Sequence, residues 1–229
     1  MKIAVMNYSG NVGKTSLSRD LLHFNLQDHD LLSVESVNSD GKEKMIIRGD
    51  DGDKIYTELL VTDKLILDIG SSNLESYLKN SEKESEFISS IDLFVVPVTP
   101  EKKQQVDTLK TVRDIFALGA SQNIEIIFNQ VADNQDVKEV FSDLVSSLKK
   151  LDVKTNFENS IFRHDLYSRG HQLSELISNE NYRELMEEAK RSGNNDLARE
   201  YASKFIRQKK INSLLDCYKK IFSNIIKEK

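Results

Sequence analysis

Short apolar runs alternate with longer amphipathic stretches along most of the chain. A short apolar run suits one buried strand, and apolar residues at every third or fourth position suit a helix that covers a sheet. This pattern predicts strands at residues 3–6, 31–35, 64–69, 91–100 and 124–130, a weaker strand near 159–162, and helices at 14–24, 74–90, 101–118 and 135–150. Elements in this order predict an α/β fold with a doubly wound, mostly parallel sheet and helices on both faces.

The helix expected at residues 101–118 has its apolar residues on one face. Such residues recur every three or four positions, so we expect this face to pack on the sheet. Its members are Val106, Leu109, Val112, Ile115 and Phe116.

From Leu166 onward the chain is expected to be helical. An apolar stripe runs from Leu197 to Ile226 with lysines opposite it, which indicates an amphipathic helix packed on the core or on a second copy. Gly193 and the two asparagines after it indicate a break before that stripe. We expect a nucleotide-binding domain at residues 1–178 and a C-terminal helical extension at residues 179–229.

The first predicted strand runs into a glycine-containing turn and then into a helix that opens with Gly13-Lys14-Thr15. Such a turn can bind phosphate, because its N–H groups point at the anion and the helix adds its positive dipole end. We expect Lys14 to reach the β- and γ-phosphates and Thr15 to hold Mg²⁺. The alternative is a chance tripeptide at an ordinary strand–helix turn. The expected nucleotide-binding residues of this turn are Gly10, Asn11, Val12, Gly13, Lys14, Thr15 and Ser16.

A second motif is the strand at residues 64–69, which carries Asp68 and is followed by Gly70 and small polar residues. This is a Walker B pattern, in which a buried strand brings a carboxylate to the sheet edge to hold Mg²⁺. We expect Gly70 to donate its N–H toward the γ-phosphate and to form part of a nucleotide-sensing switch. An aspartate at a strand end is common alone, and its place after the Gly-Lys-Thr turn strengthens the prediction.

These motifs resemble the deviant Walker A loop and sheet of the ParA/MinD ATPases over about residues 1–178. Aligned on Gly13-Lys14-Thr15, Ser9 stands where those proteins have a signature lysine, and Asn11 replaces their second glycine. Together with the stretch Val34–Asp40, this loop is most similar to the StbB/TraL plasmid-stability proteins, a divergent branch of that group.

The resemblance implies ATP and Mg²⁺ as cofactors, a nucleotide-dependent homodimer, and a plasmid-encoded DNA-binding partner protein. Glu35 matches the first acid of the acid-x-acid pair that orders Mg²⁺ and the attacking water, while Val37 stands at the second position. The expected catalytic residues are therefore Lys14, Asp68 and Glu35, with Asp40 as the alternative acid. Asn129 stands where those ATPases have the asparagine that hydrogen-bonds adenine, which implies nucleotide binding. Without the resemblance, Glu35 is an ordinary strand-end charge and Asn129 a turn former.

Charge is distributed unevenly along the chain. The net charge is −5, yet residues 190–229 carry 11 basic against four acidic residues. A basic tail on an acidic domain suggests nonspecific DNA contact, an acidic protein partner or a membrane surface, and a solvated helix face is the plain alternative.

Composition narrows the class of protein further. Only two prolines and 38% hydrophobic residues suit a globular domain, and no apolar run approaches the length of a membrane span. The single Cys217 agrees with a reducing compartment, and the four histidines lack metal-ligand spacing. No leader pattern precedes the first strand, so we expect a cytoplasmic protein, with the inner membrane as a peripheral alternative.

The sequence thus predicts an ATP-binding, slowly hydrolysing ParA-like switch protein in plasmid stability, partition or conjugation. Three alternatives stay open. They are a MinD-like membrane-associated positioning ATPase, a small-molecule P-loop kinase or ligase, and a binding module that holds nucleotide without hydrolysing it.

Overall fold

The computed structural model describes residues 1–34, 45–48, 51–83, 86–120, 123–166 and 172–226. The chain forms two compact units. The first comprises residues 1–163 together with the chain from Ile221 onward, and the second comprises His164–Lys220. The division into domains at residues 1–178 and 179–229 stays a prediction.

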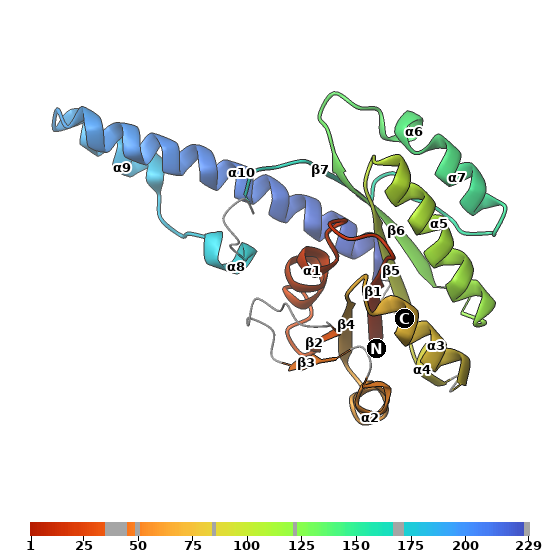
Figure 1. The fold of residues 1–229 in the computed structure, drawn as a ribbon. Coiled ribbons are helices and arrows are strands. Elements are labelled where there is room, and N and C mark those ends of the chain that lie inside the picture. The colour runs from red at the N-terminus through yellow and green to blue at the C-terminus, as the bar shows by residue number, and fades with distance from the viewer. Residues whose placement is uncertain (35–44, 49–50, 84–85, 121–122, 167–171, 227–229) are drawn as a thin grey trace. The chain divides into compact units, whose positions relative to one another are not determined.

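A single sheet of parallel strands forms the centre of the first unit (Figure 1). The strand order is β3-β2-β4-β1-β5-β6-β7 within the described residues, and every pairing between neighbours is parallel. The bounds are β1 Lys2–Met6, β2 Asp30–Val34, β3 Met45–Ile47, β4 Leu65–Ile69, β5 Leu93–Val98, β6 Ile124–Val131 and β7 Ser160–Phe162. The order reverses direction on either side of β1, so the sheet is doubly wound and the predicted fold class is confirmed.

Helices lie between most of these strands, as parallel pairing requires, and further helices follow β7. Their bounds are α1 Lys14–Ser16, η1 Leu17–His23, α2 Gly52–Val61, α3 Leu74–Lys83, α4 Glu86–Ser89, α5 Lys102–Ala117, α6 Val137–Val140, α7 Ser142–Lys149, α8 Leu173–Leu176, α9 Tyr182–Arg191 and α10 Asn195–Ile225. None of these helices is both long and apolar enough to cross a membrane.

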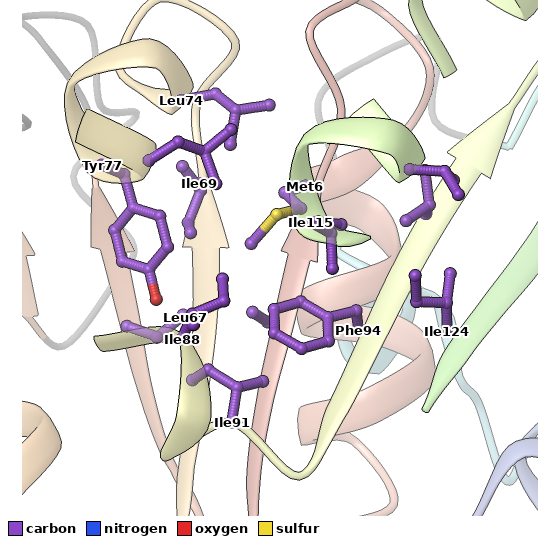
Figure 2. Packing of buried hydrophobic residues seen from close by; sticks show 14 of the residues in the cluster. Met6, Leu67, Ile69, Leu74, Tyr77, Ile88, Ile91, Phe94, Ile115 and Ile124 are labelled. Carbon is purple, nitrogen blue, oxygen red and sulfur yellow. The ribbon is translucent and has the colours of Figure 1, made fainter. Parts of the chain in front are cut away.

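One face of the sheet carries the main hydrophobic core (Figure 2). Alternate side chains of the central strands, such as Leu67 and Ile69 on β4, pack there against α3, α4 and α5. Tyr77 is fully buried in this layer, and its hydroxyl donates to the carbonyl of Phe87 at 3.1 Å. Burial of each large side chain in this layer contributes roughly 1.5–3 kcal/mol to folding.

The opposite face is covered by the helical segment that follows β1. Ile3 and Val5 point to this side because they alternate with the core-facing residues of β1. Leu17, Leu21 and Leu22 of η1 are fully buried, and η1 packs against β2 and β4. The first residues after the loop are thereby fixed to the sheet by a tight apolar contact.

Three local expectations need correction. The helix predicted at residues 14–24 is π-helical from Leu17 to His23, where the N–H of Phe24 donates to the carbonyl of Arg19 five residues back at 3.0 Å. The short strand β3 was missed because three residues give too little periodicity to recognise. The strand predicted at residues 91–100 is shorter, since β5 runs from Leu93 to Val98.

The predicted apolar face of α5 is also wrong in part. Val106 is 68% exposed, whereas Val112 and Ile115 are fully buried. In its middle, α5 buries Thr108 and Thr111 instead. These side chains face the loop after β1, so the chemistry of that loop, and not the sheet, decides which face of α5 is buried there.

In the second unit, α9 and the first part of α10 run side by side (Figure 1). Gly193 adopts a φ of 74° in the turn between them. The rings of Tyr182 and Tyr201 stack with their centroids 6.4 Å apart, and the Gln208 amide donates to the carbonyl of Ser178 at 3.0 Å. The predicted break before a long amphipathic helix is confirmed.

Two substitutions on α5 test this packing. Ile115→Ala removes a fully buried side chain and should lower the free energy of unfolding by about 2–5 kcal/mol. Val106→Ala on the same helix should change it by less than about 0.5 kcal/mol, because that side chain is 68% exposed. Urea unfolding measures both, and equal losses would contradict this orientation of α5.

Candidate phosphate-binding site

The loop between β1 and α1 lines a cavity at the carboxyl edge of the sheet. The cavity has a volume of about 560 Å³, within the range of small-molecule sites. Gly70, Ser71 and Ser72, which follow β4, line its other side, and Gln130 of β6 also lines it. The loop and helix residues that line it are Gly10, Asn11, Gly13, Lys14, Thr15 and Ser16. The structure therefore brings six of the seven predicted loop residues to one cavity.

The backbone of the loop is shaped to present amides. Asn11 and Gly13 have positive φ angles of 57° and 94°, and Gly13 caps the helical segment that runs from Lys14 to His23. A side chain at Gly13 would have no room, since its Cβ would lie 2.2 Å from the amide nitrogen of Asn129. The first N–H groups of a helix have no partner within it, so they are available to an anion.

The side chain of Lys14 reaches back over the loop that precedes it. Its side chain is buried, and its ammonium donates to the carbonyl of Ser9 at 2.7 Å. The backbone carbonyl of Lys14 accepts from the hydroxyl of Ser18 at 3.0 Å, one turn further along the helix. The cation is therefore held over the loop, and Lys14 is one of the residues that line the cavity.

Polar side chains of α5 hold the first half of the loop. The fully buried Asn7 amide donates to the hydroxyl of Thr108 at 2.7 Å and to the carbonyl of Pro97 at 2.8 Å. Its oxygen accepts the N–H of Ser9 at 2.8 Å. The N–H of Tyr8 donates to the hydroxyl of Thr111 at 3.1 Å. Each group of the Asn7 side chain is thus used to fix the path of the loop.

Ser9 occupies the position of the signature lysine in the resemblance described above. Its hydroxyl donates to Asp107 of α5 at 2.5 Å, and the residue is only 6% exposed. The Ser9 side chain is therefore short, buried and bonded within its own chain, unlike the long lysine that the resemblance would place here.

Tyr8 marks the outer side of the loop. Its phenol donates to Asp114 at 2.6 Å, and the ammonium of Lys110 lies 3.9 Å from the centre of its ring. Burial of the phenol, and then the hydrogen bond to Asp114, raise the pKa of Tyr8 above its ordinary value. The hydroxyl therefore stays protonated and keeps donating at neutral pH.

The end of β6 holds the second half of the loop. The amide of Asn129 donates to the carbonyl of Val12 at 2.8 Å, and the amide of Gln130 donates to the carbonyl of Asn11 at 2.9 Å. Val12 itself is fully buried, so its side chain packs inside while its carbonyl meets Asn129. Gln130 was not predicted, and the one signal in the sequence was its place next to Asn129 at a strand end.

The Walker B strand reaches the same edge. Asp68 is buried on β4, two residues before Gly70 of the cavity wall. The N–H of Gly70 donates to the carbonyl of Val34 at 3.0 Å and not toward the cavity. The amide of Asn73 donates to the same carbonyl at 3.1 Å. The turn after β4 is thus tied to the end of β2.

Two predicted acids cannot be placed. Glu35 and Asp40 lie outside the described residues. Among the residues that are described, no group of three or more histidine, cysteine, aspartate or glutamate side chains could hold a metal ion by itself. Thr15 lines the cavity, whereas Asp68 is buried on β4 and is not among the lining residues. Hydroxyl and carboxylate oxygens are the kind of ligand that Mg²⁺ takes together with phosphate and water.

Gly13→Ala tests how closely the loop and β6 fit. Alanine is strained at a φ of 94°, and its Cβ would also meet the Asn129 amide. Gly119→Ala is the matched control, because Gly119 has a φ of 86° but a Cβ added there would have nothing within 4 Å. Thermal and urea unfolding should show that Gly13→Ala costs about 1–3 kcal/mol more than the control. Equal costs would mean that Asn129 does not pack against Gly13.

Comparisons with known proteins complete the description. No protein-family model matches the sequence, and no curated protein matches it. A solved structure of a Borrelia burgdorferi B31 protein assigned to plasmid partition, bound to AMPPNP, is 17% identical with a TM-score of 0.53 and covers 91% of this chain and 98% of its own. The MinD cell division protein of Aquifex aeolicus is 14% identical with a TM-score of 0.46, over 73% of this chain and 84% of its own. The first of these likenesses shows the fold: the chain has the α/β fold of that Borrelia structure, with a central sheet of parallel strands.

Proposed function

We propose that this chain is a ParA-like switch ATPase that binds ATP with Mg²⁺ in the cavity after β1. The observation that carries the proposal is the cavity itself. A positive-φ loop, the start of a helix, a buried lysine and the turn after a Walker B strand all line or adjoin it. The similar Borrelia structure is bound to AMPPNP, which supports an adenine nucleotide.

Each predicted site residue has a role in this proposal. The N–H groups of Gly10–Ser16 surround the phosphates, and Lys14 neutralises charge on the β- and γ-phosphates. Thr15 and Asp68 hold the Mg²⁺ ion, which would neutralise phosphate charge during hydrolysis. Glu35 is the proposed catalytic acid, and a base contact by Asn129 is what the sequence resemblance alone implies.

Regulation would come through the turn after Asp68. Gly70 is bonded to the carbonyl of Val34, so a change at the cavity wall would reach the end of β2. We expect slow hydrolysis without a partner, because no arginine lines the cavity in the described part of the chain. A partner protein that supplies the missing charge would accelerate it.

The proposed setting is plasmid stability, partition or conjugation. The similar Borrelia protein is assigned to plasmid partition, and the sequence resemblance to StbB/TraL proteins points the same way. We propose a nucleotide-dependent homodimer that acts in the cytoplasm through a plasmid-encoded DNA-binding partner. Basic residues of α10, such as Arg207 and Lys209, are exposed and are the proposed contact with nonspecific DNA or a membrane surface.

Lys14→Ala tests the proposal. Loss of a charge-assisted contact with phosphate should weaken Mg²⁺-ATP binding roughly 10- to 100-fold. Calorimetric titration with ATP and GTP measures this, and sizing in ATP and in ADP reports the expected dimer. Lys154→Ala removes an exposed lysine from a loop and is the control for the change in charge. If the wild-type chain binds neither nucleotide, the proposed function is wrong.

A further inference from the structure

The side-chain amide of Asn129 is hydrogen-bonded to the loop between β1 and α1, called the phosphate loop below. Its nitrogen donates to the carbonyl of Val12 at 2.8 Å, and its oxygen accepts the N–H of Gln130 at 2.9 Å. The residue is only 8% exposed, and it is absent from the residues that line the cavity, whereas Gln130 lines it. Both ends of the side chain are therefore occupied by backbone groups before any base is bound.

The position of this amide also decides how the loop can turn. Its nitrogen lies 2.2 Å from where a Cβ on Gly13 would be, so the amide fills the space that the missing side chain leaves. Gln130 adopts a φ of 56°, which lets its side chain reach back to the carbonyl of Asn11. Two successive loop carbonyls are thereby turned toward β6, and the amides that alternate with them are left to face the cavity.

We propose that Asn129 is a positioning residue of the phosphate loop: it fixes the carbonyl of Val12 and the turn at Gly13, and it sets phosphate affinity without reading the base. This inference rests on the proposed function, since it assumes that the cavity binds the phosphates of a nucleotide. It assigns Asn129 a different role from the base contact that the sequence resemblance implies.

Asn129→Asp is the most direct substitution. The aspartate has the same shape but replaces the donor toward the Val12 carbonyl by a second oxygen, so the loop loses this bond and meets a repulsive charge. Phosphate affinity should fall for any ligand that the loop holds, whatever base the ligand carries. A residue that reads the base would instead change only the preference among bases.

Inorganic triphosphate separates these two roles because it has phosphates but no base. Titration of the full chain with Mg²⁺ and triphosphate, ATP or GTP should show that Asn129→Asp weakens all three by the same factor, about tenfold or more, with the ATP-to-GTP ratio unchanged. Asn123→Asp places the same charge at the exposed opposite end of β6 and should leave all three affinities unchanged.

Several outcomes would overturn the inference. Unchanged triphosphate affinity with an altered ATP-to-GTP ratio would make Asn129 a base contact. A lower melting temperature with unchanged affinities would make it only structural. If Asn129→Asp does not fold, Asn129→Ala decides between the same results. Failure of the proposed function is distinct, because the wild-type chain would then bind neither triphosphate nor ATP.

Discussion

The loop between β1 and α1 can offer its amides to an anion only because other groups take up its carbonyls. A buried backbone carbonyl without a partner is costly, so a loop that turns its N–H groups toward a cavity needs acceptors satisfied on its other side. Lys14, Asn129 and Gln130 meet this need for three loop carbonyls. Asn7 ties the start of the loop to β5 and α5, and its side-chain oxygen accepts the N–H of Ser9.

This requirement explains features of the structure that lie away from the loop. Helix α5 buries two threonines where an amphipathic pattern calls for apolar residues, because their hydroxyls meet Asn7 and Tyr8. The helical segment after the loop presses three leucines onto the sheet, which fixes the direction of its first turn. The packing of α5 and the shape of the loop thus depend on the same few contacts. A substitution that disturbs one should also disturb the other.

The sequence predicted the structure well where an apolar run is long or where the functional residues are close together in the chain. Long apolar runs predicted the central strands, and the Gly-Lys-Thr turn together with the Asp68 strand predicted which edge carries the site. The sequence failed where contacts far along the chain matter. On α5 the buried face is set by Thr108 and Thr111, which meet the loop after β1, and Gln130 reaches back to the carbonyl of Asn11. Periodicity cannot report such contacts, because it describes only a residue and its own helix or strand.

The hydrogen bond between Ser9 and Asp107 is a contact of this kind, and it bears on how a dimer could form. A serine bonded to Asp107 and almost fully buried keeps the loop within one chain, where a long cation at that position could reach a second subunit. The proposed dimer must therefore be stabilised by other groups. The proposed nucleotide site lies within one chain, which fits the proposed slow turnover without a partner.

Amide hydrogen exchange with and without Mg²⁺ and ATP reports on the N–H groups of the loop themselves. We predict that saturating Mg²⁺-ATP slows exchange at residues 10–17 and, more weakly, at residues 70–73, which line or adjoin the cavity. Binding of ATP with unchanged exchange in the loop after β1 would contradict it, because the phosphates would then be held by another part of the chain.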